Sequence, residues 1–231
     1  PVASDKESVF LAACDKFVSD SLVQIKTRGA AQVADDALLA EHNGNVKAAM
    51  DALQVIVDPC TACDLSGSRT KTVFGSGNPA ANVVFIGEAP DEADDLQGEP
   101  FVGESGQLLT KILSAIGFAR EDVYVCNILK CRTPNNRDPL PAEVTECETH
   151  LKRQLALLKP TVICCLGRGA AQSLLKTDLS LGKLREALNF YEGVPVMSTF
   201  HPAALLRNPK WKRDTWDDVR KLKALSEALV R

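Results

Sequence analysis

The chain has 231 residues, 45% of them hydrophobic, and a formal net charge of −3. This length fits one domain with an extension or two small domains, and the apolar share is large enough for a substantial core. No apolar run approaches the roughly 18 residues of a membrane span, and the N-terminus lacks the basic start and apolar middle of a signal peptide. The sequence therefore predicts a cytoplasmic protein with no membrane partner.

The first 58 residues differ in composition from the rest of the chain. Residues 6–56 are rich in Ala, Leu and Val at three- and four-residue spacings, which predicts helices. They contain almost no aromatic side chains and no motif that carries chemistry. We expect a helical N-terminal extension over residues 1–58, packed on a main domain over residues 59–231.

Predicted strands and helices alternate from residue 82 onward. Short apolar runs predict strands at 83–86, 123–128, 161–166 and 195–199, with helices at 106–116, 141–158, 169–175 and 215–230. This alternation predicts an α/β fold of three layers, with a central four-stranded parallel sheet between two layers of helices. Ligands bind such sheets beyond the carboxyl ends of the strands. At those ends this chain has Glu88, Asn127, Gly167 and His201.

Four of the eight cysteines have the spacing of a metal site. Cys60 and Cys63 form a C-x-x-C pair, and Cys131 and Cys147 lie far downstream among polar and charged neighbours. In a reducing compartment, clustered cysteines bind metal more often than they form disulfides. Zinc and a [4Fe–4S] cluster both accept four thiolates; the widely split second pair favours the cluster, and zinc stays the alternative. The other four are predicted to be small core residues: Cys14, Cys126, Cys164 and Cys165.

A glycine- and proline-rich loop with several carboxylates follows the first predicted strand, from Gly87 through Glu88 to Gly103. A carboxylate near a reacting carbon can position water and stabilise a developing positive charge. The alternative is a solvated acidic loop. The residues 103–106 then open a helix, whose N-terminal amides can hold a phosphate.

The segment after the last predicted strand combines a histidine, an apolar pair and positive charge. His201 is a candidate electrophile or general acid. Leu205 and Leu206, followed by Arg207, have the character of a wedge that enters a base stack while cations grip phosphates. Local patches make such contacts whatever the net charge, although two solvated loops are the alternative. The two basic clusters are Arg207, Lys210, Lys212 and Arg213, and Lys130, Arg132 and Arg137.

Together these segments closely resemble family 4 uracil-DNA glycosylases, the iron–sulfur branch of the uracil-DNA glycosylase superfamily. The resemblance covers about residues 59–222 and leaves the helical extension outside. Several motifs in the same order are far more specific than any one of them. The motifs are Cys60-x-x-Cys63-x-Leu65, Gly87-Glu88-Ala89-Pro90, Pro100-Phe101-Val102-Gly103, Asn127-Ile128-x-Lys130-Cys131-Arg132, Glu143 with Cys147, and His201-Pro202-Ala203-x-Leu205-Leu206-Arg207.

The resemblance implies a role for each matching residue. Phe101 matches the ring that stacks on flipped uracil, Asn127 the side chain that reads the uracil edge, and His201 the histidine near uracil O2. Glu88 and the backbone around Ala89 match the water-positioning loop. The other expected site residues are the [4Fe–4S] ligands Cys60, Cys63, Cys131 and Cys147, the thymine-excluding position Asp94, and the DNA contacts Ser105, Gly106, Leu205, Leu206 and Arg207.

The activity implied is hydrolysis of the N-glycosidic bond of uracil in single- or double-stranded DNA, by base flipping, to leave an abasic site. Catalysis would fall to Glu88, Asn127 and His201, in a monomer associated with the nucleoid. The cluster is expected to be a brace, because the reaction moves no electrons. The basic insertion of a related branch that forms a covalent histidine–sugar adduct is absent, which predicts turnover.

Two positions depart from the family pattern. Members usually have glycine at Asp91 and glutamate at Asp94. These departures leave open a catalytically weakened iron–sulfur module that only binds nucleic acid, or a glycosylase with an altered range of deaminated bases. An electron-transfer protein is a third alternative.

Overall fold

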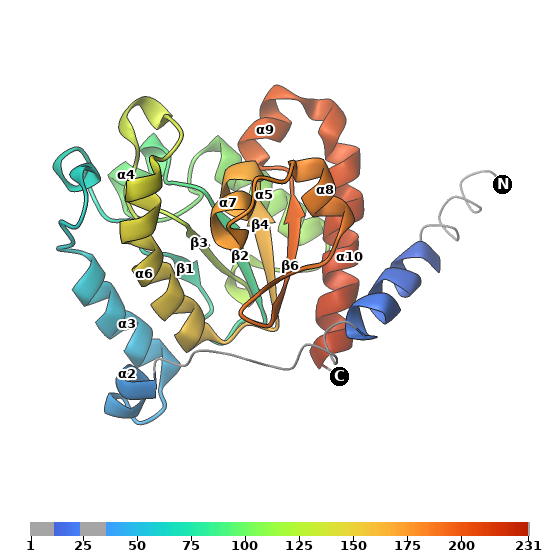
Figure 1. Cartoon of the computed structure of the whole chain (residues 1–231), viewed down its shortest axis with the longest axis horizontal. Coiled ribbons are helices and arrows are strands. Elements are labelled where there is room, and N and C mark those ends of the chain that lie inside the picture. The colour runs from blue at the N-terminus through green and yellow to red at the C-terminus, as the bar shows by residue number, and fades with distance from the viewer. Residues whose placement is uncertain (1–11, 24–35, 231) are drawn as a thin grey trace.

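The computed structural model describes residues 12–23 and 36–230. A six-stranded sheet lies between two layers of helices (Figure 1). Its order is β1-β3-β2-β4-β6-β5, and the four central strands, β3, β2, β4 and β6, are parallel. The strands are β1 (Ser76–Gly77), β2 (Val83–Gly87), β3 (Tyr124–Asn127), β4 (Val162–Leu166), β5 (Asn189–Tyr191) and β6 (Val194–Thr199).

The predicted three-layer fold is confirmed, with one correction to the sheet. All four predicted strands are present and form the parallel centre. Two short strands, β1 and β5, pair antiparallel at the two edges, so the whole sheet is mixed. They were missed because two and three residues are too few to show the period of a strand, and the side chains of β5 are only half-buried.

Most helices fall where the sequence predicts them, and α6 matches its predicted range to the residue. Residues 12–23 are also helical, whereas 6–11 and 24–35 of the predicted helical region lie outside the described residues. None of the helices in the described ranges is long and apolar enough to cross a bilayer. The remaining helices are α2 (Asp36–Glu41), α3 (Val46–Val57), α4 (Glu92–Gln97), α5 (Glu104–Ala115), α6 (Pro141–Leu158), α7 (Arg168–Leu175), α8 (Leu181–Glu186), α9 (Pro202–Arg207) and α10 (Lys212–Val230), with short 3-10 turns at Asp64–Gly67, Arg120–Asp122, Pro134–Asn136 and Pro209–Trp211.

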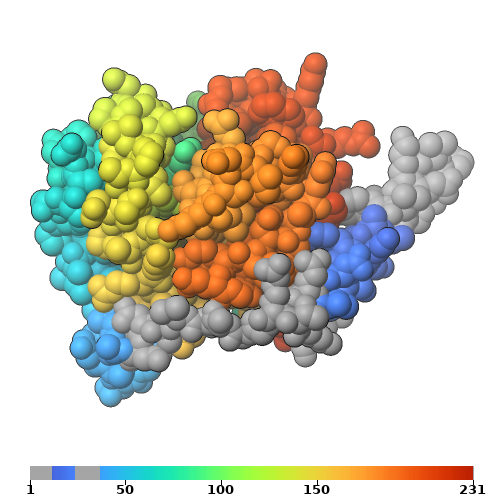
Figure 2. Space-filling view, in the orientation of Figure 1, coloured from blue at the N-terminus to red at the C-terminus, as the bar shows by residue number. Residues whose placement is uncertain are grey.

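Alternate side chains of each central strand enter two separate cores, as the two-residue period of a strand requires. In β2, Val84 and Ile86 pack under α3, α6 and α7, and Figure 2 shows these helices in succession on one face. Val83 and Phe85 pack on the other side, under α5 and α10. Burial of each of these side chains contributes roughly 1.5–3 kcal/mol.

The helix α3 connects the N-terminal region to the main core. Asn45 caps its start by accepting the N–H of Ala48 at 3.1 Å. Met50 and Leu53 are buried in the core cluster that also contains α6 and the sheet. The helix ends at Val57, and only two residues separate it from Cys60. The position of α3 therefore fixes where the cysteine-bearing segment begins.

Candidate functional site

A cleft of about 870 Å³ opens at the carboxyl ends of the parallel strands. Glu88 follows β2, and His201 follows β6. The pairing of Gly87 with Asn127 brings the end of β3 beside the first loop. The sheet therefore gathers the predicted polar residues from strands that are far apart in the sequence.

The Asn127 side chain is fully buried and has no protein partner. Both Oδ1 and Nδ2 lack a hydrogen bond to any residue that the structure describes. A Cβ at position 87 would collide with Asn127 Oδ1 and would lie 2.7 Å from Phe101 Cζ. Glycine at 87 thus lets the amide and the Phe101 ring come together. A buried amide without a partner is costly, and a donor and an acceptor side by side suit the edge of a planar polar ligand.

Phe101 adopts a left-handed backbone conformation, with φ at 58°, which a bulky residue rarely takes. Three contacts hold it there. Asp94 Oδ1 accepts the N–H of Val102 at 2.9 Å, and Arg120 Nη2 donates to the carbonyl of Pro100 at 2.9 Å. The carbonyl of Phe101 lies against Gly106, where any side chain would collide with it. The ring is therefore placed by a rigid turn and not by its own rotamer alone.

The His201 ring has a fixed hydrogen-bonding role. Its Nδ1 accepts the N–H of Ala203 at 3.1 Å and so caps α9. Burial and the nearby Arg207 charge lower the pKa of His201 to about 4. The imidazole is therefore neutral at pH 7 with its proton on Nε2, a donor available to a ligand. Its ring centroid lies 5.4 Å from that of Phe101.

Glu88 lies over the first turn of α7. A Cβ at Gly169 would collide with the Glu88 carboxylate, so glycine there makes the approach possible. Burial and the Asp138 carboxylate raise the pKa of Glu88, while Arg168 lowers it. A carboxylate with a raised pKa in a cleft is typical of a group that handles a proton or a water molecule.

Asp91 caps α4 and needs no glycine-like backbone. Its φ is −87°, in the extended region, and its carboxylate accepts the N–H of Asp94 at 3.0 Å. Asp94 returns a weaker contact to the Asp91 N–H at 3.5 Å, which completes a capping box. The departure from glycine at 91 therefore has a structural purpose, and the only support for the non-catalytic alternative is weakened.

The structure separates the predicted DNA contacts. Leu206 is 43% exposed, but Leu205 is 1% exposed and packs inside, so only Leu206 is free to enter a duplex. Arg207 is exposed on the rim of the cleft. Ser105 also lines the cleft, although it is largely buried. Gly106 is buried against the carbonyl of Phe101 and so helps to position that turn.

The three cations of the second basic cluster contact other groups of the protein. Lys130 is only 1% exposed. Arg137 forms a two-pronged ion pair with Glu143, at 2.9 and 2.5 Å. Arg132 pairs with Glu92 at 3.4 Å. The other basic cluster, in the segment 207–213, is exposed.

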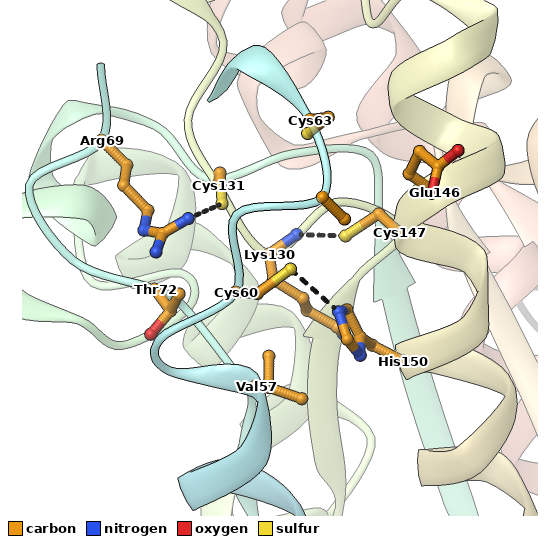
Figure 3. Close-up of a pocket in the computed structure, with 11 residues that line it drawn as sticks. Val57, Cys60, Cys63, Arg69, Thr72, Lys130, Cys131, Glu146, Cys147 and His150 are labelled. Carbon is orange, nitrogen blue, oxygen red and sulfur yellow. Dashed lines mark hydrogen bonds between the residues drawn. The ribbon is translucent and has the colours of Figure 1, made fainter. Parts of the chain in front are cut away.

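The four predicted ligand cysteines line one small cavity (Figure 3). Two come from the segment after α3, one from the loop after β3 and one from α6. Cys131 and Cys147 also pack against Ala89 of the Glu88 loop, together with Leu129. The cysteine cavity therefore borders the loop that carries Glu88. The members of the set are Cys60, Cys63, Cys131 and Cys147.

Two hydrogen-bond donors and an imidazole nitrogen lie beside these sulfur atoms. The N–H of Lys130 donates to Cys147 Sγ at 3.2 Å, and Arg69 Nη1 donates to Cys131 Sγ at 3.4 Å. The Nε2 of His150 lies 3.3 Å from Cys60 Sγ. Donors of this kind stabilise thiolate charge, so the donor set fits a thiolate-bound group.

The cysteines do not converge on a single point. Within the described ranges, no three Cys, His, Asp or Glu side chains come close enough to hold one metal ion. A zinc site needs its ligands about 2.0–2.3 Å from one centre. Four thiolates suit zinc and a [4Fe–4S] cluster alike, so the residues fit either group by their chemistry. The other four cysteines are buried, unpaired core residues, as predicted.

Two features, one in the cleft and one beside the cysteine cavity, were not predicted from the sequence. Phe200 stacks on Trp211, with centroids 4.8 Å apart and rings within 10°, and both line the cleft. Lys130 was assigned to a surface patch although it is buried. A tryptophan in a basic segment, and a lysine between a buried strand and a ligand cysteine, were the available signals.

Comparison with known proteins places the chain in a family. The family described as "Uracil DNA glycosylase superfamily" matches residues 74–220. A "Type-4 uracil-DNA glycosylase" from Archaeoglobus fulgidus is 47% identical over 171 residues, covering 71% of this chain and 86% of that protein. One from Thermotoga maritima is 41% identical over 179 residues, covering 76% and 93%. A "Type-5 uracil-DNA glycosylase" from Pyrobaculum aerophilum is 31% identical over 149 residues, covering 56% and 64%. The chain therefore belongs to the type-4 uracil-DNA glycosylases of the uracil-DNA glycosylase superfamily.

Proposed function

We propose that the protein hydrolyses the N-glycosidic bond of uracil in DNA and leaves an abasic site, as a step of base-excision repair. The observation that carries this proposal is the buried Asn127 amide, which has no hydrogen-bond partner in the described part of the chain and lies, like the Phe101 ring, against Gly87. An amide offers one donor and one acceptor to a base edge, and cytosine presents the reverse pattern to uracil, so the site would discriminate between them.

Each of the expected substrate-binding and catalytic residues has a proposed role. The target base leaves the stack at a cost of a few kcal/mol and stacks on Phe101. Asn127 reads its edge, and the Nε2–H of His201 donates to uracil O2 as negative charge develops on the leaving base. Glu88 holds the attacking water and stabilises the cationic sugar. Asp94 acts through the backbone of Phe101, and with Ala89 it shapes the wall near uracil C5.

We propose that Cys60, Cys63, Cys131 and Cys147 hold a [4Fe–4S] cluster. When bound, the cluster would supply a rigid cross-link between the segment after α3, the loop after Asn127 and α6, with no redox step in the reaction. The helical region 1–58 and the main domain 59–231 would meet at this brace. Iron and sulfide analysis tests the assignment, with four of each per chain expected. One zinc per chain would contradict it.

We propose that DNA crosses the mouth of the cleft, with Leu206 entering the base stack and Arg207 and its basic neighbours on the phosphates. Trp211 lies exposed on the same rim and suits stacking with an unpaired base. The protein would act as a monomer, in the compartment that holds the DNA.

An oligonucleotide assay tests the function. Single- and double-stranded oligonucleotides with one uracil are incubated with the iron-loaded protein and then treated with alkali, which breaks the strand at abasic sites. Scission at the uracil position is expected in both, and a parallel set with hypoxanthine and mispaired thymine reports the range of bases. Absence of scission by protein with a full complement of iron would contradict the proposal, and a stable protein–DNA cross-link would contradict turnover.

A further inference from the structure

Lys130 is a cation in the protein interior. Its side chain is 1% exposed, and its Nζ donates to the carbonyl oxygen of Asn127 at 2.8 Å. Among the residues that the structure describes, this is the only hydrogen bond of the ammonium, and no ion pair compensates its charge. A buried ammonium without a negative partner is strongly unfavourable. Its place therefore calls for an anion nearby.

The nearest candidate is the four-cysteine cavity. Lys130 lines that cavity, and its own N–H donates to Cys147 Sγ at 3.2 Å. Figure 3 shows Lys130 among Cys60, Cys131 and Cys147. Glu146 also lines the cavity, but its side chain is exposed and forms no ion pair with Lys130. Four thiolates around a [4Fe–4S] core leave a net negative charge, which would compensate the ammonium.

The other end of the contact is the proposed uracil reader. The N–H of Ile128 donates to the carbonyl of Gly87 at 2.9 Å, and that of Leu129 donates to the carbonyl of Glu88 at 3.0 Å. Lys130 Nζ donates to the carbonyl of Asn127, the residue directly before these two. Because the Asn127 amide has no hydrogen-bond partner within residues 12–23 and 36–230, its direction depends on this backbone.

We propose that Lys130 is a positioning residue that couples the cluster to the base-reading amide. The cluster's negative charge keeps the ammonium buried, and the ammonium fixes the carbonyl of Asn127, so loss of either loosens the grip on uracil. This inference rests on the proposed cluster and the proposed function.

Two substitutions separate the charge of Lys130 from its hydrogen bond. Lys130→Met removes both at similar volume, and Lys130→Gln keeps a donor without the charge. The control is Lys71→Met, an exposed lysine near the same segment. Iron content, the reduction potential of the cluster and inhibition by free uracil are measured on each iron-loaded protein. Iron content and excision by the unaltered protein report separately on the cluster and on the function.

A positive charge near a cluster raises its reduction potential. We expect both Lys130 variants to have a more negative potential than the unaltered protein and Lys71→Met to have the same potential. Free uracil is expected to bind about tenfold more weakly to Lys130→Met, with a smaller loss for Lys130→Gln. An unchanged potential in both variants, or unchanged uracil binding in Lys130→Met, would overturn the inference.

A measurement on the unaltered protein covers the case in which the variants fail to fold. In iron-loaded protein labelled with ¹⁵N-lysine, a buried ammonium exchanges its protons slowly and keeps an NMR cross-peak at neutral pH, whereas exposed lysines lose theirs. One persistent lysine signal, shifted by the cluster and displaced when uracil binds, is expected. Absence of such a signal, or the shift of a neutral amine, would contradict a charged Lys130.

Discussion

The Asp94 carboxylate accepts the N–H of Val102 at 2.9 Å, directly after Phe101, which has a positive φ. Asp94 is 3% exposed, and its pKa is raised by burial and lowered again by the backbone donors of Val102 and Phe101. Although aspartate is one methylene shorter than glutamate, the Asp94 carboxylate therefore has a structural role. It stabilises the strained turn that presents the Phe101 ring.

Replacement of Asp94 tests this relationship. Asp94→Ala leaves the Val102 N–H without an acceptor, so the free energy of unfolding should fall by about 1–3 kcal/mol and uracil excision should slow. Asp94→Asn keeps an acceptor, so both its free energy of unfolding and its rate of excision should fall less. Glu92→Ala, an exposed position on the same helix, is the control. Denaturation and single-turnover kinetics measure the two effects; equal rates for Ala and Asn would contradict the role given to Asp94.

Asp91 is expected to matter for stability and not for chemistry. Because its backbone is extended, Asp91→Gly relieves no strain, and glycine is itself an acceptable helix cap. We expect a change of only a few tenths of a kcal/mol for Gly and a loss of about 1 kcal/mol for Ala. Excision should be unchanged in both. A faster Asp91→Gly enzyme would instead show that the carboxylate harms the leaving base.

The sequence predicted the layers of the fold well because the parallel strands are buried on both faces and read as continuous apolar runs. It did not reveal α4 and α9, which are six residues each and are stabilised by Asp91 and His201 as caps. The sequence also did not show that two adjacent leucines have opposite environments. Leu205 and Leu206 are neighbours in sequence, but helical α9 turns one inward and the other to solvent.

The pH dependence of excision should be set by Glu88. It acts as a carboxylate, so activity falls as the pH drops through its pKa, which burial and Asp138 raise above the ordinary 4.5. His201 stays neutral down to its pKa of about 4. We therefore expect the acid limb of the pH–rate profile above pH 4.5, at the same position in His201→Gln although that variant is slower. A limb that moves with the histidine would contradict this assignment.

The two leucines of α9 should respond differently to truncation. Leu205→Ala removes a buried side chain and should lower the free energy of unfolding by about 2–5 kcal/mol. Leu206→Ala should change stability by less than about 0.5 kcal/mol. It should slow excision from double-stranded DNA and leave the rate on single strands unchanged, because only a duplex needs a wedge. Equal losses on both substrates would show that Leu206 does not act in the base stack.

The most direct test of the account is the rate of uracil release by Asn127→Ala. The substitution removes a buried amide that has no hydrogen-bond partner among the residues described, so the free energy of unfolding should fall by no more than about 1 kcal/mol. Single-turnover release from a uracil-containing single strand, by protein with a full complement of iron, should fall about 100-fold or more. Release at the rate of the unaltered protein would contradict the claim that the Asn127 amide reads the base.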